Sequence, residues 1–126
     1  MQIWFADHVI IAEVKNIIGN TIKDAELMQV DRRMSQILNY PEFKGLVLKG
    51  LTIVNQERNT PFLERKNLQL AKNQIPMLTN RNTGAITVET LLKAFIWIKN
   101  DKLSLEVFDK MLHQNGLIEF KKEQKA

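Results

Sequence analysis

The last third of the chain, residues 86–123, carries the pattern that most constrains the fold. Two amphipathic stretches, ITVETLLKAFIWIK and LSLEVFDKMLHQ, follow one another. A turn at Asn115-Gly116 then leads into the alternating residues 117–122. Apolar residues that recur every three or four positions predict helices, whereas strict alternation predicts a strand. The resulting order of helix, turn, helix, tight turn and strand is typical of a winged helix-turn-helix.

The two helices have recognisable beginnings. The first is expected to start near Thr87, with Trp97 on its polar side. The residues that it is expected to bury are Val88, Leu91, Leu92, Phe95 and Ile98. The second is expected to start near Ser104, because a serine hydroxyl suits the N-cap position.

The N-terminal part predicts two more helices. Residues 3–18 are strongly apolar and are followed by Gly19, which suits a helix end, so we expect a buried helix. The β-branched run Val9-Ile10-Ile11 leaves a strand open as the alternative. Residues 24–39 show clear helical spacing, and the proline at position 41 ends that element.

The middle of the chain is harder to assign. Residues 43–54 fit either a helix opened by Pro41 or a hairpin, LVL-KG-LTIV. Lys-Gly is a poorer hairpin turn than Asn-Gly, so we favour the helix. Residues 58–84 have no clear period, and Asn80 to Gly84 reads as a loop by composition.

The predicted fold class is therefore mainly α: a compact helical domain with a winged-helix-like C-terminal part and a few short strands. A chain of 126 residues fits a single domain. We divide it into an N-terminal helical segment (1–38), a winged-helix-like part (39–122) and a frayed tail (123–126).

Charge points to a polyanionic partner. The net charge is +4, and residues 41–85 hold seven Lys and Arg against three Glu, or 7 − 3 = +4. A basic region is the electrostatic footprint of nucleic-acid binding. The chain has no Cys, no run of apolar residues long enough to span a membrane and no signal-peptide pattern, so we expect a cytoplasmic protein.

Four short motifs carry a resemblance to a known family. They are NYPEFK at 39–44, GLVLKGL at 45–51, LAKNQ at 70–74 and LHQNGLI at 112–118. In this order they resemble the winged-helix N-terminal domain of phage and bacterial replication-initiation proteins of the DnaD and replisome-organiser type. The resemblance implies a winged helix over residues 39–122 and a link to DNA replication or regulation.

Candidate site residues follow from charge and from helix faces. Carboxylates at Glu106 and Asp109 make the last helix a poor reader of DNA bases, so phosphate contacts are expected mainly from the basic middle and the final strand. The candidate nucleic-acid-binding residues are Arg65, Lys66, Lys72, Arg81, Lys110, His113, Lys121 and Lys122. The candidate protein-interface residues are Trp97, Lys93, Arg32 and Arg33.

Catalytic and metal chemistry is not expected. His8 and His113 are the only histidines; Asp109 lies four residues before His113, but the spacing offers no third metal ligand. The familiar nucleophile, phosphate-loop and zinc-protease motifs are absent from the sequence. We therefore predict no metal, no cofactor, no small-molecule substrate and no enzyme activity.

The predicted function is non-catalytic DNA binding in replication or transcription control, in a phage or mobile element. The alternative is a small interaction module that binds a partner protein or forms a homodimer through the surfaces around Trp97 and Arg32/Arg33.

Overall fold

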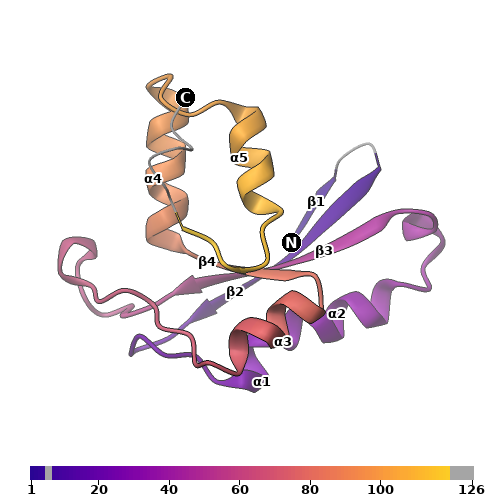
Figure 1. Ribbon diagram of the computed structural model, residues 1–126, viewed down its shortest axis with the longest axis horizontal. Coiled ribbons are helices and arrows are strands. Elements are labelled where there is room, and N and C mark those ends of the chain that lie inside the picture. The colour runs from indigo at the N-terminus through magenta and orange to yellow at the C-terminus, as the bar shows by residue number, and fades with distance from the viewer. Residues whose placement is uncertain (5–6, 120–126) are drawn as a thin grey trace.

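The computed structural model describes residues 1–4 and 7–119, which form a three-layer α/β fold (Figure 1). Its centre is a mixed sheet with strand order β1-β2-β3-β4-β5. β1 is antiparallel to β2, and the remaining neighbours pair in parallel. The strands are β1 (Gln2–Trp4), β2 (His8–Asn16), β3 (Val47–Asn55), β4 (Thr83–Thr87) and β5 (Gly116–Leu117). The prediction of a mainly α fold is therefore wrong.

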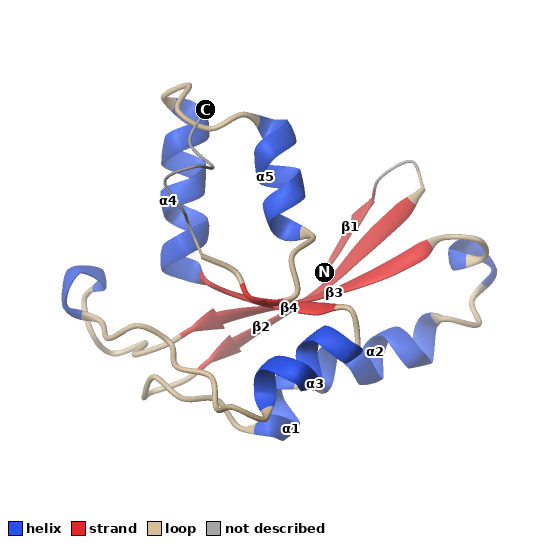
Figure 2. Ribbon diagram, viewed as in Figure 1, coloured by secondary structure: helices blue, strands red, loops and turns tan. Residues whose placement is uncertain are grey.

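Helices cover both faces of the sheet, as Figure 2 shows. One face carries α1 (Asp24–Leu27), α2 (Gln29–Ile37) and α3 (Gln74–Asn80). The other face carries α4 (Val88–Lys99) and α5 (Leu105–Leu112). Short 3-10 helices at Pro41–Phe43 and Phe62–Glu64 lie in the connections before and after β3.

β2 corrects the helix predicted over residues 3–18. Val9, Ile10, Ile11 and Ala12 are all buried, because alternate side chains face α2 and α5. A strand covered on both faces reads as a continuous apolar run, which periodicity cannot separate from a buried helix. The β-branched run Val9-Ile10-Ile11 favours a strand, and the segment is one.

β3 overturns both readings of residues 43–54. The segment forms one long strand through the supposed Lys49-Gly50 turn, paired with β2 along its whole length. Gly50 is needed where β3 meets β4, since a Cβ there would lie 2.7 Å from Thr83 Oγ1. Pro41 begins only a short 3-10 helix.

The amphipathic helices lie where they were predicted, but Leu92 and Phe95 of α4, which were expected to be buried, are 44% and 63% exposed. The single helix predicted over residues 24–39 is divided at Met28 into α1 and α2, and α2 ends at Ile37. The side chains of Thr87 and Ser104 cap α4 and α5 by accepting hydrogen bonds from Thr90 N and Val107 N. The strand after α5 does not form a wing, because β5 joins the central sheet parallel to β4.

The connections between the parallel strands do not all have the same handedness. β2, β3, β4 and β5 are parallel, and each connection leads from one strand to its neighbour on the same side in the sheet. The first two connections cross the α2 face and the last, containing α4 and α5, crosses the opposite face. The last connection therefore has the opposite hand to the first two, although such connections are almost always right-handed.

Candidate functional site

Two charged side chains interrupt the apolar face of β2 that lies under α2. Val9 and Ile11 on this face are buried, but the next two positions of the same face are Glu13 and Lys15. α2 supplies a partner to each. Lys15 Nζ donates to Gln29 Oε1, and Arg33 Nε lies 3.2 Å from Glu13 Oε1.

This polar row lies at an accessible part of the sheet. In the described chain, β1 and Met1 pair with β2 only as far as Ala12, so the carboxyl half of β2 has β3 as its one neighbour. A hollow of ≈ 260 Å³ opens beside Glu13 and is also lined by Gln2 and Arg33. Glu13 keeps 21% of its side chain exposed and Arg33 keeps 51%, so solvent and small ions reach this pair.

Next to the row, the carboxyl ends of β2 and β3 are polar and cationic. Asn55 Nδ2 donates to Asn16 Oδ1 at 2.9 Å, and Arg65 Nη1 donates to Asn55 Oδ1 at 2.7 Å. Arg65 also lies over the Phe62 ring, 4.2 Å from its centroid. A hollow of ≈ 450 Å³ at the end of β2 is lined by Lys23, Glu26 and Arg58 among others. In open parallel sheets, ligands bind at this edge.

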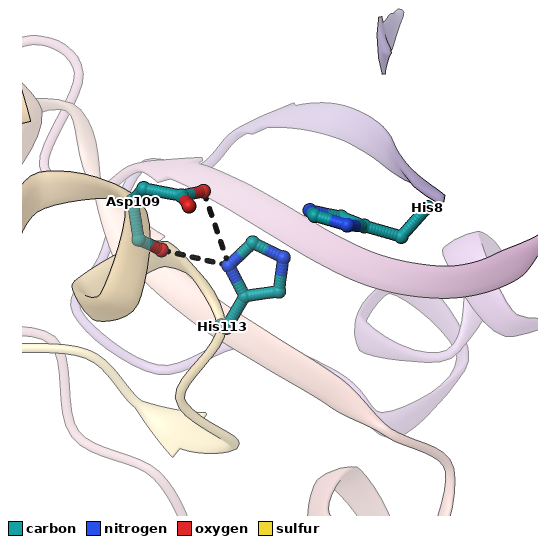
Figure 3. A group of neighbouring side chains, drawn as sticks. All are labelled: His8, Asp109 and His113. Carbon is teal, nitrogen blue, oxygen red and sulfur yellow. Dashed lines mark hydrogen bonds and ion pairs between the residues drawn. The ribbon is translucent and has the colours of Figure 1, made fainter. Parts of the chain in front are cut away.

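A second polar cluster lies on the opposite face of the sheet (Figure 3). It brings His8, at the start of β2, against Asp109 and His113 of the α5 region, and the two imidazole rings meet edge to face at 4.5 Å. His113 Nδ1 lies 2.7 Å from the backbone oxygen of Asp109. His8 Nδ1 lies 2.7 Å from Asp7 Oδ1, and this hydrogen bond holds the pKa of the Asp7 carboxyl below its usual range.

One cation of the basic middle is not on the surface at all. Lys49 is buried in β3, and its Nζ donates to Asn115 Oδ1. Desolvation by burial lowers the pKa of Lys49 to about 8. A buried ammonium group of this kind cannot serve as an exposed phosphate contact.

The predicted nucleic-acid residues that the structure describes do not gather on one face. Arg65 and Lys66 lie near the carboxyl end of β3, whereas Arg81 precedes β4 at the opposite edge and lies 3.4 Å from Asp31. Lys110 is on the other layer, paired with Glu106 at 3.7 Å. The remaining members are Lys72, exposed before α3, His113, in the histidine cluster, and Lys121 and Lys122, which lie outside the described residues.

The predicted interface residues divide between the two outer layers. Trp97 is half-buried on α4, where Lys93 lies 3.6 Å from Glu89. Arg32 and Arg33 lie across the sheet on α2, and Arg33 belongs to the polar row. A more conspicuous feature is the apolar side of α4 that faces solvent, where Leu92, Phe95 and Ile96 are 44%, 63% and 45% exposed.

The sequence contained a signal for the polar row that the helix prediction concealed. In a helix, Glu13 and Lys15 point in directions 200° apart, but in a strand they share one face. Once residues 8–16 are read as a strand, the change from Val9 and Ile11 to Glu13 and Lys15 marks the point where an apolar face becomes polar.

Comparison with protein-family models, with curated proteins and with solved structures yields no significant match to this chain. Among the described residues, no helix is both long and apolar enough to cross a membrane.

Proposed function

We propose that this protein binds nucleic acid at the carboxyl edge of its sheet, beside the polar row of β2. The supporting observation is the gathering of Lys15, Lys23, Arg58 and Arg65 around the ends of β2 and β3. Cations spaced over such an edge suit the phosphates of a polynucleotide, which dominate its binding energy. Of the candidate nucleic-acid residues, Arg65 of the basic middle belongs to this site, whereas Lys110 of the last helix lies in the other helical layer. We expect this function in the cytoplasm.

The polar row also suits a chemical step on the bound backbone. Mg²⁺ prefers oxygen ligands and is held by one or two carboxylates together with substrate phosphate oxygens. Glu13 would hold the ion in the hollow beside β2, and the Lys15 ammonium would stabilise the charge that develops on the phosphate. Water would attack phosphorus and lose a proton to solvent, one P–O bond would break, and the departing oxygen would take a proton from solvent. The half-exposed Arg33 side chain would move away from the Glu13 carboxylate when the ion binds there.

A mobility-shift titration with generic duplex DNA tests the binding proposal. We expect a shift at low salt that weakens steeply as salt is raised, because each phosphate contact releases counterions. Arg58→Ala should weaken binding and flatten the salt slope by about one contact. Lys110→Ala is the matched control, since Lys110 lies in the other helical layer. Absence of any shift with duplex or single-stranded DNA or RNA at low salt would refute the proposal.

A second candidate function is self-association through α4. Leu92, Phe95 and Ile96 form an exposed apolar strip, which is the kind of surface that marks protein interfaces. A homodimer packed through this strip would cover it with an identical apolar surface.

The Phe95→Ser variant separates this candidate from nucleic-acid binding. Sedimentation analysis should give a dimer for the wild type and a monomer for Phe95→Ser, with DNA affinity per chain unchanged. Leu63→Ser, which alters a fully exposed leucine in the β3–α3 connection, should remain dimeric. A wild-type chain that stays monomeric at high concentration would contradict self-association.

A further inference from the structure

We propose that His8, Asp109 and His113 form a zinc-binding site that fastens α5 to the start of β2. The proposal does not depend on the nucleic-acid function, because this cluster lies on the opposite face of the sheet from the polar row. One ligand atom from each of the three residues lies within 4.8 Å of the other two.

The donor set fits zinc better than the other common ions. Two imidazoles and one carboxylate are typical zinc ligands, and a water molecule completes the tetrahedron in sites with three protein ligands. Mg²⁺ and Ca²⁺ prefer oxygen donors throughout. Tetrahedral ligands at zinc lie about 3.3 Å apart, so small side-chain rotations would close the present 4.8 Å arrangement around an ion.

An oxygen atom faces Nδ1 of each imidazole, as is usual for histidines that bind a metal through Nε2. His8 Nδ1 faces the Asp7 carboxylate at 2.7 Å, and His113 Nδ1 faces the Asp109 carbonyl oxygen at 2.7 Å. An Nδ1 that donates its proton to oxygen places the lone pair on Nε2, which is how second-shell oxygens fix a coordinating histidine. The Nε2 atoms of both rings and Oδ1 of Asp109 are buried, which limits competition from bulk water.

The location gives the ion a structural consequence. His8 begins β2, while Asp109 lies in α5 and His113 caps the end of that helix. Both belong to the β4–β5 connection, which crosses the sheet with the unusual hand. Within the described residues, β5, which ends this connection, pairs with β4 at Gly84–Gly116 and Ala85–Leu117. An ion that joins positions about 100 residues apart along the chain would therefore hold α5 in place.

Zinc chloride titrated into the whole chain at neutral pH tests the site, with any histidine tag removed beforehand. We expect one ion per chain by calorimetry, a higher Tm with zinc and no effect of magnesium. Cobalt should give the intense visible absorption of a tetrahedral site. Because the chain has two histidines and no cysteine, loss of one ligand cannot be compensated easily.

Variants that keep the volume of the side chain make the result decisive. His8→Gln, His113→Gln and Asp109→Asn should each weaken zinc binding by at least about tenfold while far-UV circular dichroism stays native. Glu106→Gln, which alters an exposed carboxylate on the same helix, should bind zinc like the wild type. The site is disproved if the folded wild type binds no zinc, or if both histidine variants keep wild-type affinity.

Discussion

The Lys15→Gln variant is expected to lose Mg²⁺-dependent cleavage of DNA by about 10²-fold or more, because it removes the ammonium group that we propose stabilises the phosphate and that now donates to Gln29 Oε1. Glu13→Gln should lose at least as much, since the amide no longer offers an anionic ligand to the ion. Conversion of supercoiled plasmid to nicked and linear forms measures the rates, with and without EDTA.

Three comparisons make this prediction specific. Lys110→Gln, in the other layer, should cleave like the wild type and controls for contaminating nucleases. Glu13→Gln should still bind DNA in EDTA, because the cations of the carboxyl edge are unchanged. Arg33→Gln should need less Mg²⁺, since it removes the guanidinium that now lies 3.2 Å from Glu13. Equal cleavage by the wild type and both row variants would show that Glu13 and Lys15 are not catalytic.

The elements α2, α4 and α5, which each bury one face, were predicted correctly as helices from the sequence, whereas strands that bury both faces were not recognised. α2 and α5 bury one stripe, so their apolar period and, for α5, the Ser104 cap were visible in the sequence. β2 and β3 are covered on both faces and lose the alternation that identifies a strand. Since the sheet is built from these strands, the error in two elements became an error in the fold class.

The two candidate sites differ in how much of each could have been predicted. The polar row needed only the correct assignment of residues 8–16, because Glu13 and Lys15 are two positions apart. The histidine cluster needed the tertiary fold. The i,i+4 spacing of Asp109 and His113 was evident in the sequence, but His8 is brought to them by a sheet whose order no local pattern specifies.

Gly84→Ala is expected to destabilise the protein by about 2–3 kcal/mol, the upper range for forcing extra volume into a packed site. A Cβ at Gly84 would lie 2.6 Å from the backbone oxygen of Gln114 and 2.8 Å from Ile118 Cδ1. The backbone oxygen cannot rotate away as a side chain can, so β5 would have to separate from β4. Urea unfolding followed by circular dichroism measures the free energy of unfolding.

Gly19→Ala provides the control, because no atom lies within 4 Å of its added Cβ and the effect should stay within about 0.5 kcal/mol of zero. Gly84→Ala should also weaken zinc binding, since Gln114 directly follows His113 and any retreat of β5 moves that ligand. DNA binding should be unchanged, because the carboxyl edge of β2 and β3 does not include β5. If Gly84→Ala is as stable as Gly19→Ala, β5 does not pack closely on β4 at Gly84. The packing of β5 would then not help to hold His113 in position.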